Sequence, residues 1–215
     1  MARRTAAVEQ TRRRIIEAAM QCHAEQGIVA TSLQDVARRA DVALGTVYRH
    51  FPTLEDLVGA CGEQFFALLG LPDREQSRAR FRGARSRAER IERLLAEVTA
   101  LYRPAAGAFL HVRDARRELQ AAADGHERLE GAIDLLVDEA LRPLRPSVAQ
   151  RHAVRALLDA RFWTTLLDHG LDADAAEALL AALIDRALLG DPAAAGSHPD
   201  LSSTRGRPPP AARRP

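Results

Sequence analysis

The sequence predicts an all-α protein of about nine helices, with three short helices ahead of longer and more apolar ones. Three observations lead to this prediction. Apolar residues recur at three- and four-residue intervals along most of the chain, as they do in helices that bury one face. No stretch alternates apolar and polar residues in the way of a half-buried strand. Serine, threonine or aspartate precedes several of the helical stretches, where the side chain can cap the first turn.

The first two helices are marked by their ends. The first is expected over residues 9–27, because apolar side chains lie on one side of it and Gly27 is a suitable C-cap. Ser32 and Asp35 are spaced as a capping box and predict the start of the second helix. That helix is expected to end near Ala40.

A short polar helix follows a short turn. Residues 41–43 are expected to form the turn, and the helix Leu44–Phe51 ends where a proline disfavours its continuation. Thr53 and Asp56 form a second capping box. They predict a fourth helix that carries apolar residues at helical spacing and ends near Gly70.

The rest of the chain predicts further helices and a tail. The Arg-rich stretch 72–90 is expected to be a solvated helix face and a loop. Three helical patterns follow at about 89–103, 107–122 and 126–142. Residues 147–169 are apolar on almost every side, and such a helix must be covered on all sides. Asp172 caps a last helix that ends at Gly190, and the Pro-rich residues 191–215 are expected to be disordered.

Composition and charge limit the classes of protein. Of the 215 residues, 47% are hydrophobic and 28% charged, which allows both a core and a solvated surface. Residues 1–93 carry a net charge of +4 and residues 94–190 a net charge of −4, so a polyanionic partner is expected for the first half. No apolar run is long enough for a membrane span or follows the basic start as in a secretion signal. We therefore expect a cytoplasmic protein.

The two cysteines, Cys22 and Cys61, lie within apolar helical patterns. We expect both thiols to line the core, because buried cysteine is usually structural. A role for one of them in sensing oxidants is the alternative.

Two short helices joined by a three-residue turn predict a helix-turn-helix. The second helix of such a unit lies in the major groove of DNA, where hydroxyl, guanidinium and imidazole groups meet bases and phosphates. A surface helix without a partner is the alternative. The candidate DNA-binding residues are Thr31, Ser32, Leu44, Gly45, Thr46, Tyr48, Arg49 and His50.

Residues 31–58, TSLQDVARRADVALGTVYRHFPTLEDLV, resemble the DNA-binding region of the TetR family of bacterial transcription regulators. The matching positions are Asp35-Val36-Ala37, Ala40, Val42, Gly45-Thr46-Val47-Tyr48, His50-Phe51, Glu55 and Leu57. Three positions depart from the family pattern. Asp41 stands where Gly is usual, Ala43 where Ser usually caps the recognition helix, and Leu54 where Lys is usual. The last two departures would remove phosphate contacts.

The resemblance implies a repressor that binds a palindromic operator on double-stranded DNA as a homodimer and is released by a small molecule. It implies a helix-turn-helix domain over residues 1–53 and a helical domain for ligand binding and dimerisation over residues 54–190. Independently of the resemblance, Arg3, Arg4, Arg12, Arg13 and Arg14 are expected to form a flexible basic arm that contacts phosphates or the minor groove. A disordered, solubilising start is the alternative.

Candidate residues for the second domain come from its apolar and aromatic positions. The expected dimer surface includes Ala156, Leu157, Ala160, Trp163, Leu167, Leu180, Leu183 and Ile184. The expected ligand site includes Phe65, Phe66, Tyr102, Phe109, His111, Arg113 and Trp163. Each of these is also a candidate for plain core, because pockets and cores use the same residue types. Arg103, Arg113 and Arg116 leave an anionic ligand open.

The sequence does not contain the residue patterns that a metal site or a known class of enzyme would require. His111 and Asp114 share a helix face, but two ligands are too few for a metal site. No phosphate-binding loop, nucleophile elbow or zinc-protease motif occurs, so we expect no catalysis, cofactor or metal. A ligand-independent DNA-organising protein or adaptor with the same helix-turn-helix remains the alternative.

Overall fold

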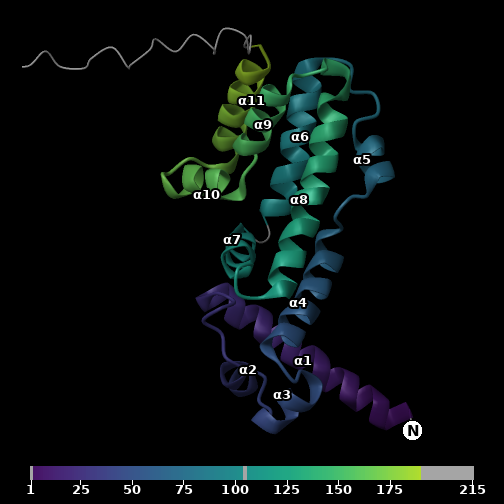
Figure 1. The fold of residues 1–215 in the computed structure, drawn as a ribbon, viewed down its shortest axis with the longest axis vertical. Helices are drawn as coiled ribbons and strands as arrows, with labels where there is room; N and C mark the ends of the chain where they lie inside the picture. Colours follow the sequence, from purple (N-terminus) through teal and green to yellow (C-terminus); the bar gives the residue numbers. More distant parts are fainter. Residues whose placement is uncertain (1, 104–105, 190–215) are drawn as a thin grey trace, which may run out of the picture.

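Helices make up the architecture of the described part of the chain, residues 2–103 and 106–189. The computed structural model has eleven α-helices and one short 3-10 helix there, and it confirms the predicted all-α fold class. Figure 1 shows an elongated molecule with α1, α2 and α3 at one end and α9, α10 and α11 at the other. The expected helix end at Gly190 and the expected tail, residues 191–215, lie outside the described residues.

The helices differ in length, and α1 and α8 are the longest. None of those in the described ranges is both long and apolar enough to cross a membrane. In chain order they are α1 (Ala2–Gln26), α2 (Leu33–Arg39), α3 (Leu44–His50), α4 (Leu54–Leu69), α5 (Arg74–Arg80), α6 (Arg87–Tyr102), α7 (Ala106–Ala115), α8 (Gln120–Leu141), the 3-10 helix η1 (Arg142–Leu144), α9 (Val148–Leu157), α10 (Ala160–Asp168) and α11 (Ala173–Leu189).

A first hydrophobic cluster holds α1, α2 and α3 against the first half of α4. Its members include Ile15 of α1, Val36 of α2, Val47 of α3 and Leu57 of α4, and all four are completely buried. α3 is therefore fixed through its inner face alone, which leaves its outer side chains free of any packing role.

The helix ends in this region confirm their sequence signals. Ser32 accepts a hydrogen bond from the Asp35 N–H at 3.1 Å, and Thr53 accepts one from the Asp56 N–H at 3.1 Å. Gly27 follows α1 with φ +88°, a left-handed conformation in which glycine carries no steric cost.

The N-terminal segment is helical from Ala2, so the prediction of a flexible basic arm is wrong. Residues 2–14 are rich in Arg and Ala, which favour helix, and contain no Gly or Pro that would end it. The Arg12 guanidinium lies over the Phe51 ring, with its Cζ atom 5.2 Å from the ring centroid. This arginine therefore contributes to the first cluster.

Both cysteines are buried in the first cluster, which confirms the prediction of core-lining thiols. Burial raises the pKa of the Cys61 thiol to about 12, and burial is also the main cause that raises the pKa of Cys22. Because the thiolate is the reactive form, these surroundings do not favour the alternative of an oxidant sensor.

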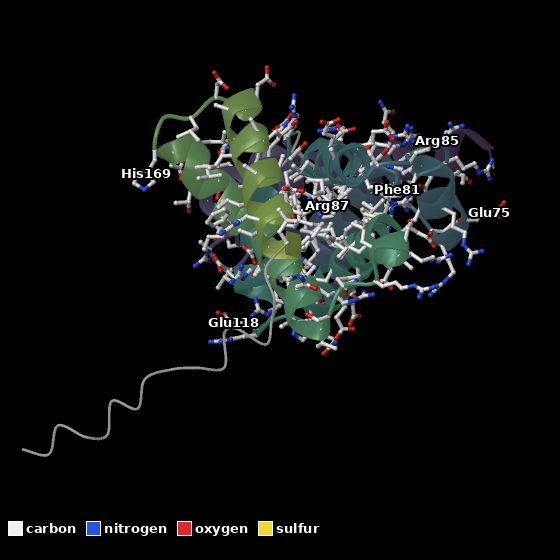
Figure 2. The ribbon with its side chains drawn as sticks, turned by 90° about the horizontal axis from the view of Figure 1, so that it is seen from above. Glu75, Phe81, Arg85, Arg87, Glu118 and His169 are labelled. Carbon is white, nitrogen blue, oxygen red and sulfur yellow. The ribbon has the colours of Figure 1, made fainter. Side chains whose placement is uncertain are left out.

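A second and larger cluster forms around α6 and α8. These two helices lie side by side in the middle of the molecule (Figure 1), and they bury Leu94, Leu95, Ile133 and Leu136. α11 packs against α6 and α9, and Figure 2 shows Arg87 of α6 beside it. α8 also contacts α4 and α7, so it connects this cluster with the region below.

The predicted single helix over residues 147–169 is two helices, so that prediction is wrong. Asp159 separates α9 from α10 and accepts a hydrogen bond from the Arg161 backbone N–H at 2.8 Å. α9 also has a polar side, because Arg155 donates to Asp134 of α8, with Nε and Oδ1 2.8 Å apart. This segment therefore needs no apolar cover on every side.

Other boundaries also differ from those expected. Residues 74–80, within the Arg-rich stretch, form α5, which is capped by Asp73. α7 ends at Ala115 and α8 begins at Gln120, both earlier than their patterns predict. The extra helix and the divided one account for eleven helices in place of nine.

Candidate nucleic-acid interface and ligand cavity

The outer face of α3 carries polar side chains that the fold does not use. Tyr48 is 50% exposed and Arg49 is exposed, and neither side chain forms a hydrogen bond or ion pair with the described residues. Leu44 and Gly45 are also exposed at the start of this helix. Figure 1 shows α3 at the extreme end of the molecule, where a duplex could approach without obstruction.

The turn between α2 and α3 is held by α1. Asp41 adopts φ +52°, which explains why a glycine would suit this position. The Arg14 guanidinium donates hydrogen bonds to the Ala40 carbonyl oxygen at 2.6 Å and to the Asp41 carbonyl oxygen at 3.1 Å. Ala43 provides no side-chain cap for α3, as its identity predicts. Arg14 is therefore a structural residue, and the turn depends on it.

The remaining candidate DNA-binding residues divide into two groups. Thr46 and His50 are half-buried on α3, and Ser32 is exposed although its hydroxyl lies 2.5 Å from the Asp35 carboxylate. Thr31 is buried, and its hydroxyl donates to the Gly27 carbonyl oxygen at 2.7 Å. Its interpretation as a DNA contact is therefore wrong, because its hydrogen bond closes the connection between α1 and α2.

Leu54 lies in a third hydrophobic cluster and not on a free surface. It is half-buried and packs against a cluster formed by Ile28, Val58, Ala115 and Ala122, with Leu119 also in contact with that cluster. This cluster joins the end of the helix-turn-helix to α7 and α8. The apolar side chain that departs from the family pattern thus has a packing role here.

Glu55 connects the start of α4 to the start of α8. The Ala121 N–H donates a hydrogen bond to the Glu55 carboxylate. Leu119 precedes α8 and cannot cap it with a side-chain hydrogen bond. A carboxylate from α4 therefore takes the place of a local N-cap, at the positive end of the helix dipole.

A cavity of about 80 Å³ lies where α1, α4, α7 and α8 meet. Most of its lining is apolar and includes Met20 of α1, Phe65 and Phe66 of α4, and Val112 of α7. Two imidazoles, His23 of α1 and His111 of α7, are its ionisable side chains apart from the Cys61 thiol.

His23 is a buried polar group without a partner. The side chain is 8% exposed, and neither ring nitrogen has a hydrogen-bond partner among the described residues. Burial, and to a smaller extent the neighbouring His111, lowers the pKa of His23 to about 4. The imidazole is therefore uncharged at neutral pH.

The predicted ligand residues lie in different places. Phe65, Phe66 and His111 line the cavity. Phe109 contacts Phe65 edge to face, with ring centroids 5.5 Å apart, but belongs to the larger core. The sequence interpretation missed His23, although a histidine among the apolar positions of the first helix was a usable signal.

The other three candidates have structural roles. Tyr102 donates its hydroxyl to the Leu158 carbonyl oxygen at 2.6 Å, and Trp163 is buried in the larger core. One guanidinium nitrogen of Arg113, Nη1, donates to both carboxylate oxygens of Asp159, at 2.9 and 3.0 Å. Within the described residues these side chains do not reach the cavity, so they are no longer candidates for it.

The apolar side chains expected at a dimer surface also divide. Trp163, Leu180 and Ile184 are buried in the protomer's own core, so their assignment to a surface is wrong. Leu183 is 37% exposed, and Ala156 is exposed. The half-buried members are Leu157, Ala160 and Leu167.

Other apolar side chains lie exposed at the same end of the molecule, viewed end-on in Figure 2. They include Phe162 of α10 and Leu179 of α11. Neither was among the expected dimer residues.

Groups of three or more His, Cys, Asp or Glu side chains that could hold a metal ion do not occur in the described ranges.

Comparison with known proteins relates the first region to a family. Residues 15–61 match the family described as "Bacterial regulatory proteins, tetR family". The transcriptional repressor KstR of Rhodococcus jostii is 34% identical over 94 residues, which cover 43% of this chain and 41% of that protein. KstR of Mycobacterium tuberculosis is 29% identical over 156 residues, which cover 71% of this chain and 68% of that repressor. The chain thus spans less than half of the first of these relatives.

Solved structures share the fold over most of the chain. A transcriptional regulator from Rhodococcus sp. Rha1 superposes with a TM-score of 0.63 at 17% identity and covers 82% of this chain and 95% of its own. The multidrug binding protein EbrR, solved in complex with malachite green, gives a TM-score of 0.56 at 24% identity. It covers 82% of this chain and 96% of its own.

Proposed function

We propose that this chain, whose residues 15–61 match the TetR family of bacterial regulators, is a cytoplasmic repressor released from its operator by a small molecule. The exposed outer face of α3 is the observation that carries the proposal. Its inner face packs in the core through Val47, and the side chains of Tyr48 and Arg49 on the outer face form no hydrogen bond or ion pair with the described residues. The matched relatives are named as transcriptional regulators, in agreement with this assignment.

The proposed reading surface consists of the exposed part of α3. Tyr48 provides a hydroxyl for a phosphate, and Arg49 can pair with guanine or with a phosphate. Gly45 has no side chain, so the backbone of α3 can approach DNA closely there. The position faces open space, since nothing lies within 4 Å of a Cβ atom placed on it. Leu44, Thr46, His50 and Ser32 surround these groups and complete the proposed contact set.

We further propose that two protomers bind an inverted repeat. A two-fold dimer would present two copies of α3 to half-sites about one helical turn apart. The exposed apolar side chains of α10 and α11, with Leu183 among them, are the proposed dimer surface. This assigns DNA binding to residues 1–53 and ligand binding and dimerisation to residues 54–190, with α4 in both packing clusters.

Footprinting on genomic DNA tests the proposal. We expect protection of one or a few inverted repeats, and Arg49→Ala should relax the preference at one base in each half-site by about tenfold. Arg85→Ala is the matched control, because Arg85 is exposed and lies in the connection between α5 and α6, away from α3 (Figure 1). Protection of many unrelated sites would instead support the ligand-independent DNA-organising protein.

A further inference from the structure

We propose that the cavity between α1, α4, α7 and α8 is the regulatory ligand site, and that it takes a small uncharged molecule with a single hydroxyl group on an apolar body. The hydroxyl would pair with His23. Phenol is the simplest probe of this class. The inference rests on the proposed function for its regulatory part, but its binding chemistry can be tested separately.

The lining excludes a charged ligand. No Asp, Glu or Arg is among the described residues that line the cavity, which is formed mainly by Met20, Ile28, Val58, Phe65 and Phe66. Moving an ion from water into such surroundings without a partner is strongly unfavourable. The three arginines that left an anionic ligand open, Arg103, Arg113 and Arg116, do not line it.

His23 supplies the recognition of the single polar group. Buried polar side chains are nearly always hydrogen-bonded, yet both nitrogens of this imidazole lack a partner in the described structure. A neutral imidazole has one donor and one acceptor nitrogen. A hydroxyl can satisfy either of them, because it both donates and accepts. A hydrocarbon of the same shape would leave His23 unpaired.

The size of the cavity points to a small ligand. A cavity of about 150 Å³ is enough for benzene, so a space of about 80 Å³ requires some widening before it holds an aromatic ring. Met20 and Phe65 are half-buried and can move outward to provide it. Phe65 and Phe66 lie edge to face, with centroids 5.7 Å apart, a packing that an added ring can extend.

The position of the cavity explains how such a ligand would act on DNA binding. His23 lies in the last turn of α1, and His111 faces the cavity from α7. A Cβ atom on Gly27 would lie 3.3 Å from Nδ1 of His111, so this ring packs against the connection from α1 to α2. A ligand between the two imidazoles would therefore favour one placement of α1 relative to α7, and through α1 one placement of the helix-turn-helix.

Calorimetric titration of the full-length protein with phenol and toluene tests the chemistry, because these ligands have the same shape and differ in the hydroxyl. We expect phenol to bind roughly tenfold more tightly than toluene, as one additional buried hydrogen bond would give. His23→Leu should bring the two affinities within about twofold. His23→Gln, which keeps a donor and an acceptor, should retain part of the preference, and His169→Leu, an exposed histidine after α10, should leave it unchanged.

Equal affinities of phenol and toluene for the wild-type protein, or an unchanged preference in His23→Leu, would overturn the proposal. Tighter binding of benzoate than of phenol would overturn the choice of an uncharged ligand. If His23→Leu does not fold, His23→Gln takes its place. A full wild-type preference for phenol in the folded His23→Gln variant would count against His23, and so would a loss of that preference in His169→Leu.

Operator binding separates the inference from the proposed function. Phenol at saturation should lower operator affinity at least about tenfold, and operator DNA should lower phenol affinity by the same factor. A protein that binds its operator but shows no such coupling would keep the proposed function and refute this site as regulatory. A protein that binds phenol as described but protects no DNA would refute the proposed function alone.

Discussion

The outer face of α3 and the cavity below α1 use polar side chains in opposite ways. Tyr48 and Arg49 are exposed, so water satisfies their polar groups and the fold gains nothing from them. His23 is buried, and nothing among the described residues satisfies its ring nitrogens. Changes on α3 should therefore alter DNA binding without altering stability, whereas changes at His23 should alter both stability and ligand binding.

The proposed DNA recognition by the outer face of α3 requires two copies of this helix, one from each protomer of a dimer. Leu183→Glu places a charge on the proposed dimer surface, so we expect monomers in sedimentation and loss of operator binding of about a hundredfold or more. Because Leu183 is 37% exposed, the monomers should remain folded. Leu68→Glu on α4 is the matched control, and it should remain dimeric. A dimeric Leu183→Glu protein would move the interface elsewhere.

The second prediction concerns the pH dependence of stability. The pKa of His23 is lowered to about 4 in the folded protein, against an ordinary value of 6.5. The folded state thus resists protonation more than the unfolded chain does. The contribution of His23 to the free energy of unfolding should be fully present above pH 6.5 and fall as the pH drops below that value. It should level off near pH 4, with a total loss of about 3 kcal/mol.

Denaturant unfolding of the wild-type protein and of His23→Leu is measured at a series of pH values. The difference between their free energies of unfolding gives the pH-dependent contribution of His23. A difference that stays constant between pH 7 and pH 4 would show that His23 is not held uncharged.

The third prediction concerns Leu54, which lies between the two regions. Leu54→Lys should lower the free energy of unfolding by about 1 kcal/mol, since it removes a half-buried apolar contact with the cluster around Val58. The salt dependence of DNA binding should not change. Ala67→Lys, on the exposed side of α4, is the control for added charge. A stable Leu54→Lys protein with a steeper salt dependence would mean that this position faces the phosphate backbone.

The smallest expected effect is a gain in stability at the turn before α3. Asp41→Gly removes a side chain from a residue with φ +52°, so the free energy of unfolding should rise by about 0.5–1 kcal/mol. Asp41→Ala keeps the Cβ atom and should show no such gain. Chemical denaturation distinguishes the two variants, and an equal response would indicate that the left-handed conformation is not strained.

Local signals predicted the first region of the molecule well. The capping boxes at Ser32 and Thr53 act within a single helical turn, so their residues alone specify where α2 and α4 begin. The prediction that Thr31 contacts DNA is wrong, because its hydroxyl donates to the Gly27 carbonyl oxygen and its burial depends on how α1 meets α2. A sequence motif identifies candidate contact residues, but it does not show which of their polar groups are already hydrogen-bonded within the fold.

Long-range packing decides what the sequence could not predict. The start of α8 depends on Glu55 of α4, and the break at Asp159 is reinforced by Arg113 of α7. The cavity exists only where four helices meet, and of its two imidazoles only His111 was among the predicted ligand residues, although the place of His23 among apolar positions was a signal for it. The predicted aromatic residues include Tyr102, which the core uses instead.

The central claim is that the outer face of α3 recognises DNA and has no part in folding. Its most direct test is to measure operator affinity at matched salt together with the free energy of unfolding for Tyr48→Ala and the wild-type protein. We predict that affinity falls at least about tenfold on every sequence, while the free energy of unfolding changes by less than about 0.5 kcal/mol. Wild-type affinity, or an affinity loss accompanied by an equal loss of stability, would contradict the claim.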